Sequence, residues 1–239
     1  MAMEKIKILN LNIWNYNNFE ERKPKIVKFI KKHNPDIITF QEIRDDVRFN
    51  KKGDNQAKQI NRELGYKYYC FYSVSDKRKE RPEKYQHECV EGSAILSKLP
   101  IIKVEKKKLK KHKDDIYSCG NLCVKIKAKK IIDIVVVHFS NSNYFSLLHL
   151  LETLKYVNDK KINPIIIGDF NMYESDVLNS LTEDKFVSSM KYKKYLSYPI
   201  KKWTLDYVLI PKKYRFKSFE CSGNDLSDHK ALVAEIEVK

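Results

Sequence analysis

Short apolar runs alternate with polar segments along the chain, a pattern typical of many buried strands and fewer helices. Residues 5–13 carry apolar side chains on both faces, which predicts a strand buried inside a sheet. Residues 36–42 predict a second such strand. Between them, residues 20–32 have apolar side chains at helical spacing, and Asn34-Pro35 is a typical helix end.

The remaining pattern predicts further strands and three more helices. The helices are expected at 55–64, where Gly65 follows, around 147–157, and near 174–181. The strands are expected at 66–72, 93–97, 101–109, 116–127, 131–139, 164–168, 203–210, 215–221 and 230–237. Residues 75–91 are almost wholly polar and predict a mobile surface loop, and a polar, tyrosine-rich stretch ends near residue 200.

The order of these elements predicts one domain over residues 1–239. Strand–helix–strand units occur near 5–42 and 131–168, strands outnumber helices, and no Gly/Ser-rich linker divides the chain. The expected fold class is an α/β sandwich with sheets inside and helices outside.

Composition narrows the class of protein. Hydrophobic residues make up 42% of the 239, which supports a substantial core and excludes disorder of the whole chain. No apolar run approaches the length of a membrane-spanning helix, and the N-terminus lacks a signal-peptide core. We therefore expect a cytoplasmic, monomeric protein. The five cysteines form no CxxC pair and are expected to be reduced.

The charge balance leaves two interpretations open. The chain has 47 basic and 31 acidic residues, a net charge of +16, and lysines dominate the basic set. This excess fits a phosphate-rich partner, or simply solvated lysines that favour solubility. The densest segments are 103–113, which would also protect a sheet edge, and 191–202, which interleaves lysine with tyrosine. The second segment suits single-stranded nucleic acid or lipid headgroups.

Polar side chains interrupt apolar strands at their ends, and these are the candidate chemical groups. They are Asn10, Asn12, Glu42, His138, Asp169, Asn171, Asp206, Asp228 and His229. Burying such a group costs roughly several kcal/mol unless it is paired or binds a metal. Carboxylate oxygens suit Mg²⁺ or Mn²⁺, and histidines and asparagines can donate to phosphate oxygens. The set therefore predicts metal-assisted attack on a phosphate ester.

Several motifs around these residues occur in one order. They are LNIW, FQE, GSAILSKLPI, VHFS, GDFN, LDYV and SDHK. Together they resemble the endonuclease/exonuclease/phosphatase (deoxyribonuclease I-like) superfamily, from about residue 5 to 237. The resemblance implies a four-layer α/β sandwich, with two mainly antiparallel sheets packed face to face. It also implies a divalent-metal-dependent phosphoesterase.

The resemblance assigns a role to each matching position. Glu42 is similar to the principal metal-ligating carboxylate, Asp228 to the second acid of the metal site, and Asn12 to the amide beside it, a substrate contact. Asp169 matches the residue that orients or activates water, and Asn171 a phosphate-contacting amide.

Three further positions complete this set. His229 matches a histidine that binds the scissile phosphate or, in another account, serves as general base. Asp206 matches the carboxylate that orients it, and His138 a candidate proton donor to the leaving oxygen. Abasic-site endonucleases usually carry tyrosine where this chain has His138, and they follow the Asn12 position with an acidic residue and glycine. Abasic-site repair is therefore not expected.

We expect a nucleic-acid phosphodiesterase whose partner is the phosphate backbone of DNA or RNA. The alternative is a phospholipid, sphingolipid or inositol-type phosphoesterase that binds a lipid headgroup. A third interpretation, an inactive nucleic-acid-binding module, is disfavoured because the residue set is complete. Asn10 is expected to be structural, Trp203 to be packed, and His149 to have no role.

Overall fold

Two six-stranded sheets form the centre of the computed structural model, which describes residues 4–76 and 88–239. Within these residues the strands are β1 (Glu4–Asn12), β2 (Ile37–Asp46), β3 (Tyr68–Asp76), β4 (Cys89–Ser97), β5 (Ile101–Lys108), β6 (Gly120–Lys127), β7 (Ile131–His138), β8 (Ile165–Asp169), β9 (Phe186–Ser188), β10 (Asp206–Pro211), β11 (Arg215–Ser222) and β12 (Ala231–Val238). The first sheet has the order β11-β12-β1-β2-β4-β3, and the second has the order β5-β6-β7-β8-β10-β9.

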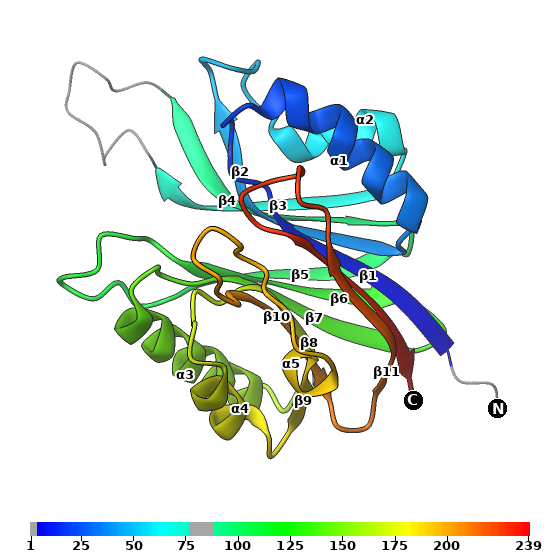
Figure 1. Ribbon diagram of the computed structural model, residues 1–239, viewed down its shortest axis with the longest axis vertical. Coiled ribbons are helices and arrows are strands. Elements are labelled where there is room, and N and C mark those ends of the chain that lie inside the picture. The colour runs from blue at the N-terminus through cyan, green and yellow to red at the C-terminus, as the bar shows by residue number, and fades with distance from the viewer. Residues whose placement is uncertain (1–3, 77–87) are drawn as a thin grey trace.

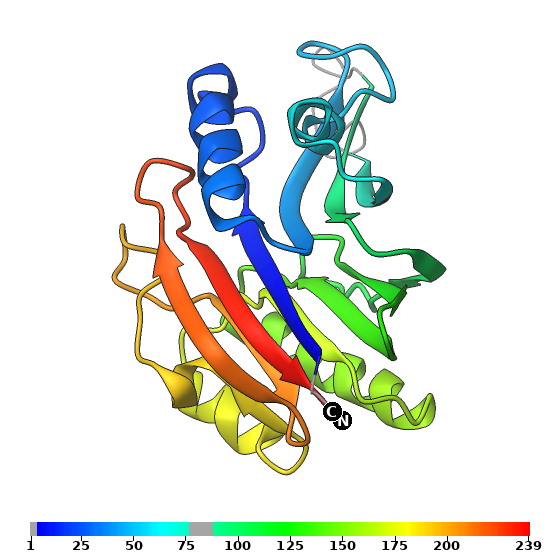
Figure 2. The same cartoon turned by 90° about the vertical axis from the view of Figure 1, so that its right-hand side faces the viewer.

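Helices cover the outer faces of both sheets, which gives four layers (Figure 1 and, from the side, Figure 2). The helices are α1 (Phe19–His33), α2 (Gln56–Leu64), α3 (Asn143–Asp159), α4 (Ser175–Thr182) and α5 (Ser189–Tyr192). The pairs β1–β2 and β7–β8 are parallel, and the other strand pairs are antiparallel. The predicted sandwich of two mainly antiparallel sheets is thus confirmed. Among the described residues, no helix has the length and apolar character needed to cross a membrane.

Strand alternation divides the apolar side chains between three layers of core. In β1, Ile6 and Ile8 point into the core between the sheets, while Leu9 and Leu11 pack in the cluster that includes residues of α1 and α2. A third cluster joins the second sheet to α3 and α4. Because successive side chains of a strand point to opposite faces, a strand buried on both faces is apolar throughout.

Some element boundaries differ from the sequence-based expectation. The ends of the predicted loop 75–91 are strand, because β3 runs to Asp76 and β4 begins at Cys89; residues 77–87 lie outside the described part of the chain. The polar stretch before residue 200 contains β9 and α5. These elements have three and four residues, too few to produce a hydrophobic period.

Candidate active site

Strand register brings three of the predicted residues together in the second sheet. Asp169, at the end of β8, lies opposite His138 of β7 and opposite Asp206 of β10. Register partners share one face of a sheet. Ile167 of β8 and Val136 of β7 belong to the core between the sheets, so the same inward face becomes polar at this end.

Gly168 explains how β7 and β8 can approach so closely beside Asp169. Its φ is +145°, and a Cβ there would lie 2.0 Å from the carbonyl oxygen of Val137. A side chain at this position would therefore push the two strands apart. This accounts for the glycine that precedes Asp169 in the GDFN motif.

The first sheet delivers Glu42 through a β-bulge. In the pairing of β2 with β4, the register shifts between Phe40 and Ile43, so Gln41 and Glu42 together oppose Ser93. Glu42 has a φ of +57°, a left-handed conformation that is uncommon for a residue other than glycine. The bulge directs the Glu42 side chain into the pocket described below, and β2 then continues to Asp46 beyond the end predicted from the sequence.

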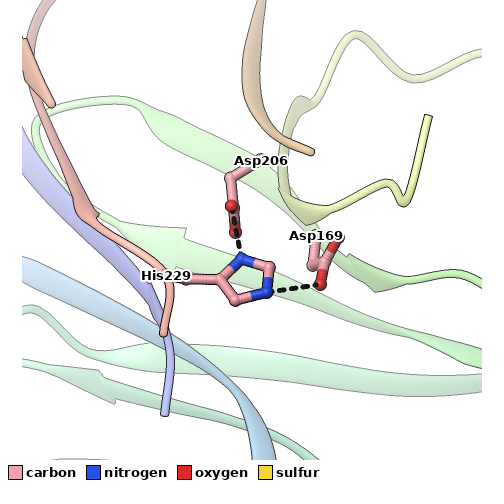
Figure 3. A group of neighbouring side chains, drawn as sticks. All are labelled: Asp169, Asp206 and His229. Atoms are coloured by element: carbon pink, nitrogen blue, oxygen red, sulfur yellow. Dashed lines mark hydrogen bonds and ion pairs between the residues drawn. The ribbon is translucent and has the colours of Figure 1, made fainter. Parts of the chain in front are cut away.

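His229, in the loop that leads into β12 of the first sheet, reaches across to Asp206 and Asp169 of the second (Figure 3). Its Nδ1 lies 2.8 Å from Oδ2 of Asp206, so the hydrogen bond predicted between these residues is present. Its Nε2 lies 3.9 Å from Oδ2 of Asp169. Burial alone would lower the pKa of His229, but the negative charges of Asp206 and Asp169 outweigh it and raise the pKa to about 10. The imidazole therefore carries a positive charge at neutral pH.

Asp169 is the carboxylate on which the other groups converge. Its Oδ2 accepts a hydrogen bond from Nδ2 of Asn12 at 2.9 Å and lies 3.8 Å from Nε2 of His138, and its Oδ1 accepts from the backbone N–H of Asn171 at 2.9 Å. Burial, reinforced by the charge of Asp206, raises the pKa of Asp169 to about 6. This carboxylate therefore takes up a proton more readily than an exposed aspartate.

Glu42 and Asp228 form a second acidic group in the same pocket. The amides of Asn12 and Asn15 donate to the two oxygens of Glu42 at 3.2 and 3.1 Å. Burial raises the pKa of Asp228, and the nearby negative charge of Glu42 raises it further. Among the described residues, no lysine or arginine forms an ion pair with either carboxylate.

Arg22 of α1 holds the two loops that lie next to this acidic group. Its guanidinium is buried and donates to backbone carbonyls, including those of Ile13 at 2.7 Å and Leu226 at 2.8 Å. Ile13 lies in the loop that carries Asn15, and Leu226 in the loop that carries Asp228. One side chain thus fixes the relative position of two loops that supply polar groups to the pocket.

Two sets of side chains offer ligands for a cation. Ligand atoms of Asp169, Asp206 and His229 lie within 4.8 Å of one another. However, Nδ1 of His229 and Oδ2 of Asp206 already share a hydrogen bond, which a metal ion would have to break. Glu42 and Asp228 are two carboxylates in one pocket, and in the described part of the chain neither forms an ion pair with lysine or arginine, so their oxygens fit a hard divalent cation better.

These groups line a pocket of about 450 Å³. Candidate residues in its wall are Glu42, His138, Asp169, Asn171, Asp228 and His229. The segment 191–202 contributes Tyr198 and Lys201 to the wall, whereas no residue of 103–113 lines it. Of the two lysine-rich segments, only 191–202 therefore reaches this pocket.

Sequence reasoning missed several contacts of the site. Asn10 donates to Oδ1 of Asp206 at 3.5 Å, which ties it to a candidate residue. Asn15 and Arg22 lie outside the apolar strands, so no interrupted pattern marks them. Trp203 was expected to be packed, but it is 40% exposed and lines the pocket. His149 has no place in the pocket but is buried in α3, where its Nδ1 accepts from the backbone N–H of Ser140.

The comparisons with known proteins agree with this geometry. A sequence model of the endonuclease/exonuclease/phosphatase family matches residues 9–229. The chain belongs to this family. Its members are hydrolases of phosphoester bonds, which fits a pocket of acids, amides and histidines. A comparison with curated proteins found no match.

Several solved structures share the fold of this family member at low sequence identity. An endonuclease/exonuclease/phosphatase from Bacteroides vulgatus is 19% identical, with a TM-score of 0.74 over 99% of this chain and 100% of that one. The human Nocturnin catalytic domain with bound sulfate is also 19% identical, with a TM-score of 0.74 and coverage of 98% and 94%. A mannosyl-6-phosphatase from Bacteroides thetaiotaomicron is 14% identical, with a TM-score of 0.68 and coverage of 97% and 99%.

Proposed function

We propose that this chain is a monomeric, single-domain phosphodiesterase that hydrolyses nucleic acid by in-line attack of water, with Mg²⁺ or Mn²⁺ as its cofactor. The observation that carries the proposal is the convergence of two acidic groups from opposite sheets on one pocket. Glu42 and Asp228 form one, and Asp169, with the His229–Asp206 pair, forms the other. Separate roles for the two groups follow from their partners.

Glu42 and Asp228 are the residues that would hold the metal. A bound divalent cation would supply positive charge against a phosphate oxygen as negative charge develops there. Asn12 and Asn15 orient Glu42, and Asn12 also holds Asp169. Because both amide hydrogens of Asn12 are used in this way, we revise its expected role from substrate contact to the positioning of two carboxylates.

Asp169 would act as the general base. A base works best when its pKa lies near the working pH, and burial brings the pKa of Asp169 to about 6. Its backbone position is fixed by two ladder partners, so Oδ2 faces the pocket between His138 and His229. In this position it can orient a water molecule and accept its proton as the water attacks phosphorus.

His229 would stabilise the phosphate, in preference to serving as base. The hydrogen bond from Nδ1 to Asp206 fixes the orientation of the ring and leaves Nε2 facing Asp169. A protonated Nε2 donates to a phosphate oxygen, and the remaining hydrogen of the Asn171 amide can do the same. His138, on the other side of Asp169, would donate a proton to the leaving oxygen.

Nucleic acid is the preferred substrate class because of the wall contributed by the segment 191–202. Lys201 supplies positive charge at the pocket, and Tyr198, like Trp203, supplies an aromatic ring. Lysines near a phosphate backbone release counterions, which makes affinity fall as salt rises. The net charge of +16 has the sign that this contact requires.

A lipid phosphodiester is the second candidate, because two bulky apolar side chains are exposed near the pocket. Ile116 is 70% exposed beside Tyr117, and Ile200 is 67% exposed beside Lys201; Tyr117 and Lys201 both line the wall. Exposed apolar side chains beside a site can insert into a lipid surface. Their positions favour this alternative over an inositol phosphate, which has no apolar part.

The test is hydrolysis of single-stranded DNA, RNA, duplex DNA and phospholipid micelles with Mg²⁺ or Mn²⁺ at rising salt. We expect cleavage of nucleic acid that weakens steeply with salt and stops with a chelator. Glu42→Gln and Asp228→Asn are the matched inactive variants. Turnover of phospholipid without cleavage of any nucleic acid would make the lipid phosphodiesterase the preferred function.

A further inference from the structure

An exposed aromatic pair with a lysine lies in the wall of the pocket, and none of the chemical steps above uses it. The rings of Tyr173 and Trp203 are stacked, with centroids 5.1 Å apart and planes inclined by 26°. The ammonium of Lys201 lies 5.8 Å from the centre of the Trp203 ring. Tyr173 and Trp203 are 46% and 40% exposed, and all three residues line the pocket that holds Asp169 and His229.

The backbone fixes this pair relative to the catalytic residues. Tyr198 and Trp203 exchange two backbone hydrogen bonds of 2.9 and 3.1 Å, which closes the loop that carries Lys201. Just before this loop, Ser197 accepts from the backbone N–H of Asp206 at 3.0 Å through its hydroxyl oxygen, and from that of Lys230 at 2.8 Å through its carbonyl. The loop is thus hydrogen-bonded to Asp206, which contacts the His229 ring, and to Lys230, which follows His229 in the sequence.

Tyr173 is close in the sequence to Asn171, the proposed phosphate contact. It follows Asn171 by two residues, a span of at most roughly 7 Å of backbone. A flat group attached to a phosphate held by Asn171 therefore lies within reach of the aromatic pair. Large aromatic side chains usually bury much of their surface. Two stacked rings that stay 46% and 40% exposed therefore leave an open face on which a third flat ring could stack.

We propose that Tyr173, Trp203 and Lys201 form a stacking subsite for one unpaired nucleobase next to the scissile phosphate. This inference rests on the proposed nucleic-acid phosphodiesterase and narrows its substrate to single-stranded or locally unpaired nucleic acid. Base stacking on an aromatic ring requires the base to leave its own stack, which is easiest in a single strand. Lys201 adds a positive charge that suits both the π-face of the ring and the adjoining phosphates.

The decisive comparison uses two oligonucleotides of equal length and charge. One is a short oligothymidylate, and the other replaces each nucleoside by an abasic tetrahydrofuran unit, so that the bases are removed and the sugar–phosphate backbone remains. Binding is measured by fluorescence anisotropy in the presence of a chelator, and cleavage is measured with Mn²⁺. Trp203→Ala removes the ring and Trp203→Phe restores an aromatic face. Phe49→Ala is the matched control, because Phe49 is 54% exposed and stacks on Tyr16, with Arg48 over its ring, outside this pocket.

We expect Trp203→Ala to weaken binding of oligothymidylate about 5- to 150-fold, the range measured for loss of one stacked base. Its affinity for the abasic strand should stay within twofold of the wild type. Trp203→Phe should recover most of the lost affinity, and Phe49→Ala should change the affinity for neither strand. Quenching of tryptophan fluorescence by oligothymidylate should also disappear in Trp203→Phe.

Two results would overturn the proposal in distinguishable ways. If the wild type cuts both strands and Trp203→Ala binds oligothymidylate as the wild type does, the stacking subsite is wrong and the phosphodiesterase stands. An equal loss of affinity for both strands in Trp203→Ala would also mean that the stacking subsite is wrong while the phosphodiesterase stands. If the wild type neither binds nor cuts either strand but hydrolyses phospholipid in micelles, both proposals fail, and the aromatic pair belongs to a lipid contact.

Discussion

Replacement of Asp206 by asparagine isolates the contribution of one hydrogen bond to catalysis. The Asp206 carboxylate is buried and accepts from Nδ1 of His229 at 2.8 Å, while Asn10 donates to its other oxygen at 3.5 Å. In the variant, the amide oxygen can keep the contact with Asn10, which turns the new NH₂ group toward Nδ1 of His229. Nδ1 must then accept a hydrogen bond, so the ring becomes neutral and carries its proton on Nε2.

The magnitude follows from the type of bond that is lost. A hydrogen bond to a charged group contributes about 1.5–3 kcal/mol. Since about 1.4 kcal/mol corresponds to a tenfold change in rate, kcat should fall about 10- to 150-fold. KM should change less than threefold, because His229 strengthens its contact with the phosphate only as charge develops in the transition state. Asp133→Asn, which breaks the surface ion pair of Asp133 with Lys125, is the matched control and should leave both constants unchanged.

The assay is steady-state hydrolysis of a fluorogenic single-stranded oligonucleotide, with folding checked by circular dichroism. A double-mutant cycle with His229→Gln sharpens it: if Asp206 acts through His229, Asp206→Asn should have almost no further effect in the His229→Gln background. Independent, multiplicative losses in kcat would refute this reasoning. An increase in KM of the Asp206→Asn variant, with kcat at the wild-type value, would refute it as well.

Three further outcomes are expected. Glu42→Gln should abolish the rise in melting temperature on adding Mn²⁺ and lower activity more than about 100-fold, beyond what outer-shell changes cost; a retained thermal shift would place the metal elsewhere. Arg22→Met leaves the Ile13 and Leu226 carbonyls unpaired, so urea unfolding should show a loss of about 2–4 kcal/mol, with no loss if the loops hold themselves. Burial lowers the pKa of His149, so below about pH 6.5 the unfolded chain binds a proton that the folded chain refuses. Stability should therefore fall by up to about 1.4 kcal/mol per pH unit on acidification, and this slope should be missing in His149→Asn.

The sequence indicated several of the side chains that meet in this pocket, because strand register decides where those side chains lie. In β7 the apolar run 134–137 ends in His138, and in β8 the run 165–168 ends in Asp169; a polar residue at such a strand end is expected to be paired or functional. Once the two strands are parallel neighbours, their carboxyl ends coincide. The pairing of His138 with Asp169 follows from the pattern alone, before any loop is considered.

The β-bulge at Glu42 was the main feature of the strands that sequence reasoning overlooked. A signal for it exists: Ile38 and Phe40 are two residues apart, but the next residue on the helix-facing side is Ile43, three positions on. A step of three in a period of two indicates one inserted residue. The burial of His149 could not be predicted from the sequence for a different reason. Helix α3 packs a polar part of its surface against the loop that contains Lys110 and Asp115, which no apolar stripe could reveal.

The substrate-facing part of the pocket follows different rules from its catalytic part. Tyr173, Lys201 and Trp203 come from loops, and loop conformation is fixed by local hydrogen bonds such as those of Ser197, not by the apolar period of a strand. A change in these loops can therefore alter the rim without moving the register of Asp169. In the proposed nuclease, the choice of substrate would then lie in the loops, where the stacked pair of Tyr173 and Trp203 would favour a flat, unpaired base.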